Sequence, residues 1–221
     1  MRSLHDRFRS PSLPRNGEIV RRRESGFSLL EIVIVIAITM ILLGITFVTL
    51  GPMLREAHVD SAYDTTLMAL RNYRSKAITE RKRYIVTFTA PRTLTVSYWG
   101  VAVPVNPAPV VVQTLTLPND IQFLVQAGMP NSVATTPDNF GAGNQAIDFG
   151  QGLGAGALNY VMFMPDGSSQ DTLGNLNSGV VYVGRAAEVM SMRAVTVFGS
   201  TGRVRGWRLY QQGAGTQWSQ Q

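Results

Sequence analysis

The 221-residue sequence contains no cysteine, so it can form neither a disulfide framework nor a thiolate metal site. Histidine is scarce as well: no motif pairs His5 or His58 with a nucleophile. The glycine-rich run 150–156 lacks the Lys-Ser/Thr pair and the helical pattern of a phosphate-binding loop. Asp166 and Asp171 have an incomplete calcium-loop spacing, which favours a plain turn. We therefore expect no catalytic residue, no metal and no cofactor, and hence a protein that is not an enzyme.

Charged residues are also sparse, at 15% of the chain, whereas apolar residues make up 45%. The apolar content is typical of a folded protein and argues against disorder throughout. The net charge of +6 is unevenly distributed, because residues 1–26 contain seven arginines and only three acidic residues. The basicity is therefore mainly a property of an N-terminal leader and does not by itself indicate a nucleic-acid-binding protein.

One long apolar run, Ile32 to Leu50, contains no charged residue. As a helix, its roughly 19 residues cover about 28 Å, which is the thickness of a bilayer core. A helix is expected despite the many β-branched residues, because backbone amides in lipid must pair within the segment. The preceding arginines place the N-terminus in the cytoplasm. A secretory signal peptide is the competing interpretation, but its small-residue cleavage site follows the apolar core, whereas Gly26 precedes it.

The chain after the span divides into a helix, residues 52–82, and a β-rich region, residues 83–210. Apolar residues at helical spacing predict the buried helix face, and Asp60, Asp64 and Arg71 lie on the opposite side. The predicted buried face consists of Tyr63, Leu67, Leu70, Tyr73 and Ala77. Alternation and turn signals predict strands at 84–89, 94–98, 110–117, 121–125, 146–149, 160–164, 180–183, 194–198 and 204–210. Residues 211–221 are polar and predict a frayed tail, with Trp218 as the residue able to anchor it.

A short motif, Ser25-Gly26-Phe27-Ser28-Leu29-Leu30-Glu31, joins the leader to the apolar run. Glu31 is its most informative residue, because a carboxylate costs about 2.5–3.5 kcal/mol at the bilayer centre and less toward the interface. Such a residue usually has a partner, although a glutamate tolerated near the lipid headgroups is the alternative. The order of basic leader, Gly26, Phe27, Glu31 and apolar run resembles that of type IV prepilins.

This resemblance implies an α+β pilin fold, with a long N-terminal helix packed on an antiparallel β-sheet domain outside the cytoplasmic membrane. Residues 27–51 would be the transmembrane and filament-core part of the helix. A prepilin peptidase would remove the leader by cutting between Gly26 and Phe27, and would methylate the new amine of Phe27. Glu31 would face the N-terminal amine of a neighbouring subunit and set axial register. The implied partners are this peptidase, other pilins or pseudopilins, and the inner membrane.

Later stretches resemble more narrowly the FimT/GspH group, which comprises minor pilins of type IV pili and minor pseudopilins of type II secretion. Residues 70–78 leading into 84–88 resemble its helix-to-strand entry, and 163–167 and 193–205 resemble its C-terminal half. We therefore expect a minor pilin or pseudopilin, assembled into a pilus or pseudopilus. A signal-anchored adhesin that never polymerises is an alternative.

The C-terminal arginines suggest another alternative function. Strand alternation places Arg203, Arg205 and Trp207 on one face, with Arg208 nearby. Guanidinium groups beside an indole suit phosphate contact and base stacking. The Gly-Arg-Val-Arg sequence at 202–205 also resembles the Gly-Arg-x-Arg element of FimT-type pilins, which is linked to DNA uptake. This resemblance implies a minor pilin that binds DNA in natural transformation. The opposing interpretation is a solvated edge strand that its charges keep from mispairing.

Overall fold

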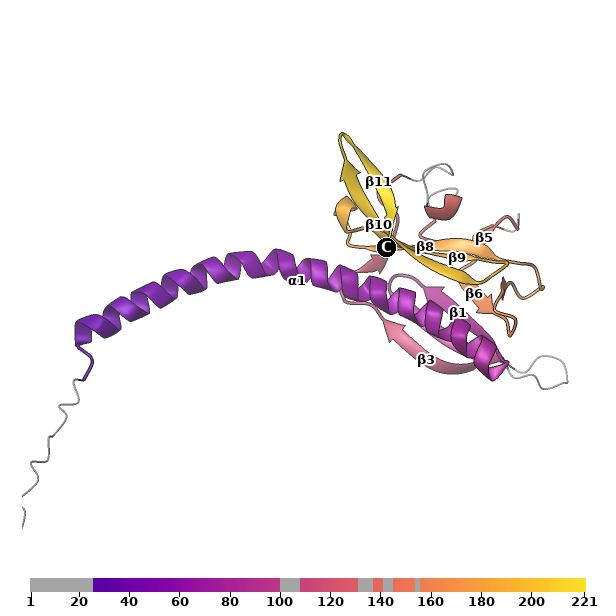
Figure 1. Cartoon of the computed structure of the whole chain (residues 1–221), viewed down its shortest axis with the longest axis horizontal. Coiled ribbons are helices and arrows are strands. Elements are labelled where there is room, and N and C mark those ends of the chain that lie inside the picture. The colour runs from indigo at the N-terminus through magenta and orange to yellow at the C-terminus, as the bar shows by residue number, and fades with distance from the viewer. Residues whose placement is uncertain (1–25, 100–107, 131–136, 141–144, 154–155) are drawn as a thin grey trace, which may run out of the picture. The chain divides into compact units, whose positions relative to one another are not determined.

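The computed structural model describes residues 26–99, 108–130, 137–140, 145–153 and 156–221 (Figure 1). They form helix α1 (Leu29–Glu80), short helices η1 (Pro137–Asn139) and η2 (Val189–Ser191), and a series of strands. The strands are β1 (Arg83–Thr89), β2 (Thr93–Trp99), β3 (Val110–Thr116), β4 (Gln122–Phe123), β5 (Ile147–Gln151), β6 (Tyr160–Phe163), β7 (Ser169–Gln170), β8 (Ser178–Gly184), β9 (Arg193–Phe198), β10 (Arg203–Gln212) and β11 (Gly215–Gln220). Contacts divide the chain into two units, Met1–Val48 and Thr49–Gln221. All but the last residue of the predicted leader lies outside the described residues.

The described part of the first unit is the apolar half of α1. Its large hydrophobic side chains are exposed, from 48% at Ile36 to 81% at Leu29. The Thr39 and Thr46 hydroxyls donate to the Ile36 and Leu42 carbonyls at 2.8 and 2.9 Å, so these polar groups are satisfied within the helix. This helix is long and apolar enough to cross a membrane, as the sequence predicts.

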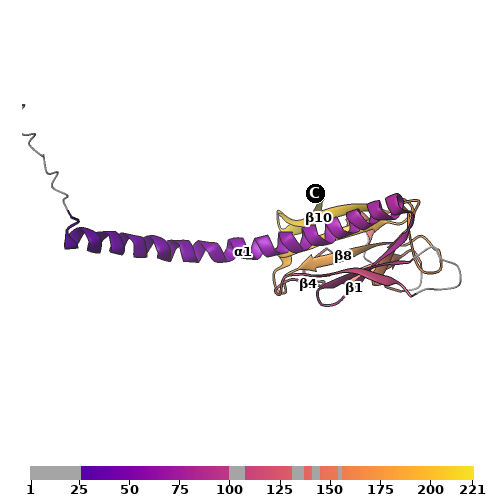
Figure 2. The same cartoon turned by 90° about the horizontal axis from the view of Figure 1, so that it is seen from below.

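The second unit begins with the amphipathic half of α1, which lies along the sheets (Figure 2). It packs on them through the predicted stripe. The stripe residues Tyr63, Leu67, Leu70, Tyr73 and Ala77 are all buried. They recur at steps of three and four, which a helix of 3.6 residues per turn aligns on one face. The stripe prediction is therefore confirmed.

Two antiparallel sheets make up the rest of the second unit. One has the strand order β3-β2-β1-β6-β7, and the other has the order β11-β10-β9-β8-β4, with β5 also paired to β8. Every strand pairing among the described residues is antiparallel. A long helix packed on antiparallel sheets confirms the α+β pilin fold class.

The second sheet is covered on both faces, which explains why consecutive side chains of β8 and β9 are buried. Successive side chains of a strand point to opposite faces. Val181 and Val183 accordingly join the main core beneath α1, whereas Val180 and Tyr182 join a second cluster. That second cluster consists of Met129, Val180, Tyr182, Met192, Ala194, Leu209 and Trp218.

The prediction of a frayed C-terminal tail is wrong. Strand β10 runs to Gln212, and β11 pairs with it from Gly215 to Gln220. Trp218 is 7% exposed, lies opposite Leu209, and donates from Nε1 to the Pro130 carbonyl at 3.3 Å. Backbone pairing is independent of side-chain polarity, so one buried indole is enough to anchor an otherwise polar strand.

Candidate functional site

The start of α1 is fixed by Ser28, which precedes the first helical residue. The Ser28 side-chain Oγ accepts a hydrogen bond from the Glu31 backbone N–H at 3.1 Å. Its carbonyl also accepts from the backbone N–H groups of Glu31 and Ile32, at 3.0 and 3.2 Å. Serine followed three residues later by glutamate is the sequence pattern of a capping box. The signal is present in the sequence, because Ser28 and Glu31 stand three residues apart at the start of the apolar run.

Capping places Glu31 in the first turn of a long helix. A carboxylate there interacts favourably with the positive end of the helix dipole. Phe27 lies just before the cap and is 78% exposed, and Gly26 has nothing within 4 Å of the position a Cβ would take. The predicted cleavage point therefore lies in open chain immediately before a regular helix. This geometry leaves Glu31 exposed and available to a group outside this chain.

The arginines of the predicted C-terminal surface do not form one exposed surface, because two of them are held in ion pairs. Arg205 pairs with Asp138 at 2.7 Å, and Arg208 pairs with Glu56 at 2.6 Å. Trp207 donates from Nε1 to the Thr196 hydroxyl at 3.0 Å and packs against the second cluster. Arg205 and Trp207 are thus bonded to residues outside α1, and Arg208 is paired with a residue of α1; all of these residues belong to the second unit.

Arg203 is the exposed member of this set. Its guanidinium lies 5.9 Å from the ring centroid of Phe198, its partner on β9. No carboxylate among the described residues lies within ion-pair distance of Arg203. The DNA-binding role of the four residues stays a prediction, but the structure neutralises two of the three arginines on which it rests.

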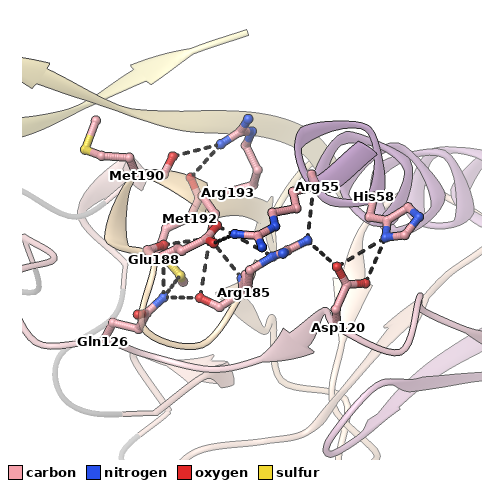
Figure 3. Close-up of polar contacts among 10 residues, drawn as sticks. Arg55, His58, Asp120, Gln126, Arg185, Glu188, Met190, Met192 and Arg193 are labelled. Atoms are coloured by element: carbon pink, nitrogen blue, oxygen red, sulfur yellow. Dashed lines mark hydrogen bonds and ion pairs between the residues drawn. The ribbon is translucent and has the colours of Figure 1, made fainter. Parts of the chain in front are cut away.

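A polar network joins α1 to the loop that follows β8 (Figure 3). Arg185 pairs with Asp120, and Asp120 also bonds His58 Nδ1 at 3.0 Å. Arg55 and Arg185 both pair with Glu188, at 3.7 and 3.5 Å. Burial raises the pKa of Asp120, but the hydrogen bond with His58 and the charge of Arg185 outweigh it, so that this pKa lies below its usual value. The sequence gives no sign of these pairs, because they join residues far apart in the chain.

Asp60 corrects one detail of the helix prediction. It was expected on the solvent face, but it pairs at 2.9 Å with Arg193, whose side chain is only 3% exposed. Burial, followed by the charge of Arg208, lowers the pKa of Arg193. A single arginine in the apolar strand β9 was the available signal, since a buried charge requires a partner. Asp64 and Arg71 are exposed, as predicted.

The two remaining candidate aspartates organise turns. Asp166 accepts hydrogen bonds from the backbone N–H and hydroxyl of Ser168, which lower its pKa. Asp171 accepts from the backbone N–H groups of Leu173 and Asn175, at 2.9 and 2.7 Å. Both patterns are those of turns held by an aspartate side chain, as the sequence interpretation preferred.

Comparison with known families places a motif on the same segment as the capped helix start. Residues 21–47 match the family described as the prokaryotic N-terminal methylation motif. The match includes Gly26, Phe27, Glu31 and most of the apolar run. No curated protein and no solved structure matches the chain. The motif supports a type IV pilin-like protein, processed by a prepilin peptidase and anchored by one apolar helix, and it points to a structural filament subunit.

Proposed function

We propose that this chain is a minor pilin or minor pseudopilin, a non-enzymatic subunit of a type IV pilus or a type II secretion pseudopilus. The observation that carries the proposal is the methylation motif at residues 21–47, which leads directly into the apolar helix. A prepilin peptidase cuts between Gly26 and Phe27 and methylates the new amine. The narrower likeness to the FimT/GspH group supports the minor-subunit role.

The exposed side chains of the first unit support assembly. A run of large apolar side chains cannot remain in water, because contiguous exposed apolar surface of this kind drives association. Lipid covers this surface while the subunit sits in the inner membrane, and the helices of other subunits cover it in the filament. The N-terminus is then cytoplasmic before cutting, and the second unit is extracytoplasmic.

Glu31 supplies the specificity that apolar contacts lack. Hydrophobic burial is non-directional, so it allows a helix to slide along its neighbour. A carboxylate paired with the Phe27 amine of a neighbouring subunit fixes one register, because any other register leaves an unpaired charge in an apolar core. The partners in this account are the peptidase, other pilins or pseudopilins, and the membrane.

The assembly role is tested with Glu31→Val and Glu31→Gln in a host that carries the filament machinery. Both variants should reach the inner membrane at normal levels, because valine makes the helix more apolar and glutamine removes its negative charge. Their abundance in sheared filaments should fall by about tenfold or more, as expected when one partner of a buried pair is removed. Ser28→Ala is the control, because it weakens the cap but keeps the charge. Wild-type assembly of Glu31→Gln would refute the register role.

DNA binding for natural transformation is a second candidate function. The observation in its favour is Arg203, which is exposed and lies over a Phe198 ring that is itself 41% exposed. A cation beside an accessible aromatic ring suits contact with phosphate and base together. Titration of the detergent-solubilised chain with duplex DNA should give a log–log salt slope of roughly −2 to −4. Absence of binding at low salt would remove this candidate and leave the filament role untouched.

A further inference from the structure

A hollow of about 410 Å³ lies on the second unit between α1 and the turn that joins β9 to β10. Its lining residues are Arg71, Arg74, Thr201, Arg203 and Val204. Three of these five carry a positive charge, and none of the described lining residues is acidic. Like charges gathered in one place repel each other, and a bound anion relieves that repulsion.

Arg74 is the fixed member of this group. Its guanidinium donates from Nη2 to the Thr201 carbonyl at 2.7 Å and from Nε to the Gly167 carbonyl at 3.2 Å. Gly202 permits this close approach, because its φ is +57° and a Cβ there would overlap the Gly167 carbonyl oxygen. The turn is therefore clamped over α1, and the Nη1 group of Arg74 makes no hydrogen bond within the described part of the chain.

Arg71 and Arg203 contrast with Arg205 and Arg208, which lie further along β10, and with Arg185, which follows β8. Arg205 and Arg208 each have a carboxylate within 2.7 Å, and Figure 3 shows how Arg185 is held by Asp120. Arg71 and Arg203 are exposed, and no carboxylate of the described residues lies within ion-pair distance of either. The arginine of β10 that has no carboxylate partner among the described residues therefore lies at the hollow, whereas Arg205 and Arg208 further along β10 are paired.

We propose that Arg71, Arg74 and Arg203 form a binding site for a phosphate group. The proposal rests on the second candidate function, DNA binding, and assigns its phosphate contacts to these three residues in place of Arg205 and Arg208. Guanidinium groups suit this ligand, because their paired N–H donors match two phosphate oxygens. Asp166, which precedes Gly167, accepts hydrogen bonds from Ser168 and is not among the residues that line the hollow. The phosphate is either free in solution or part of a nucleic-acid backbone.

The test compares two double variants of the full chain in detergent, each of which loses two positive charges. One is Arg71→Gln/Arg203→Gln, in the hollow, and the other is Arg205→Gln/Arg208→Gln, at the paired positions. Arg74 is left intact because it also holds the turn. The probes are a fluorescent 20-base-pair DNA duplex, titrated over a range of salt concentrations, and inorganic phosphate followed by calorimetry. Thermal unfolding confirms that each variant is folded at the temperature of measurement.

The hollow variant should lose about tenfold or more in DNA affinity and reduce the salt slope by about 1–2, while the paired-position variant loses less than about threefold. Phosphate binding that depends on Arg71 and Arg203, without DNA binding, supports the site with free phosphate as its ligand and rejects the DNA function. DNA binding that is lost only in the paired-position variant overturns the site and keeps the DNA function. Equal losses in the two variants, or no binding of either probe by the wild type, overturn the site.

Discussion

The two units of this chain differ in where their apolar side chains are buried. In the second unit, α1 and two sheets enclose a core in which Leu70 and Phe88 are 0% exposed. In the first unit, Leu29 and Phe47 are 81% and 76% exposed. None of the described residues buries these side chains of the first unit, so they need other surroundings such as lipid or neighbouring subunits. The second unit explains its own fold.

Charges follow the same division. Between Phe27 and Leu50 the only charged residue is Glu31, whose backbone N–H, not its carboxylate, donates to the Ser28 hydroxyl. The second unit instead pairs many of its charges internally, as Arg193–Asp60 and Arg205–Asp138 illustrate. Substitutions in the second unit should therefore change its own stability, whereas substitutions in the first should change membrane insertion or assembly.

The largest expected effect comes from substituting a glycine of the second unit, Gly179. In Gly179→Ala, the new Cβ would overlap the Asp148 carbonyl oxygen and the Phe149 Cα, which are backbone atoms that cannot move aside cheaply. We expect the second unit to lose about 3 kcal/mol of stability. Gly44→Ala is the matched control in the first unit, where nothing lies within 4 Å of the new Cβ. Denaturant unfolding followed by near-ultraviolet circular dichroism measures both, and equal effects would contradict the division into two units.

A smaller loss is expected from Asp60→Asn, which leaves the buried Arg193 guanidinium without its carboxylate. Removing one partner of a fully buried pair costs about 3–5 kcal/mol, and the 46% exposure of the Asp60 side chain reduces the expectation to about 2 kcal/mol. Asp64→Asn, four residues later on the exposed face, should change stability by less than about 0.5 kcal/mol. Indistinguishable urea midpoints for the two variants would show that the Arg193 pair contributes nothing.

The smallest effect concerns Asp120 and depends on pH. The pKa of Asp120 is lower in the folded protein than in the unfolded chain, so its contribution is present above the unfolded pKa and is lost as pH falls through the folded value. Asp120→Asn should therefore be less stable than wild type by at most about 1 kcal/mol at pH 7. The difference should shrink below about pH 4, near the usual pKa of an aspartate. Melting curves from pH 3 to 7 test this, and a constant difference would exclude an ionised Asp120 as its cause.

Local patterns in the sequence predict most of the fold. The helix stripe and most of the strands follow from periodicity, because each has one or two apolar faces to bury. Strand β11 was missed because Gln217 and Ser219 carry no apolar signal and only Trp218 reaches the core. The two-residue β7 is held largely by hydrogen bonds of Ser169 with Gly199 and Asn177, which no periodicity reveals.

The candidate sites also differ in whether a local sequence pattern is enough to find them. Gly26, Phe27 and Glu31 lie within six consecutive residues, so a linear motif is enough to find them. Alternation places Arg203 and Arg205 on one strand face, but the pairing of Arg205 with Asp138 joins residues 67 positions apart. Contacts of this kind depend on the complete fold, so the sequence alone predicted a shared arginine surface that the structure divides between ion pairs and the hollow.

The central claim, that this chain is a processed filament subunit, is tested most directly by intact-mass analysis of the chain from a host that contains a prepilin peptidase. The account predicts a chain that begins at N-methylated Phe27. The same host without the peptidase should yield the precursor with its leader attached, as should a Gly26→Leu variant in either host. Recovery of only the uncut precursor from the peptidase-containing host would contradict the account and favour a signal-anchored protein that never polymerises.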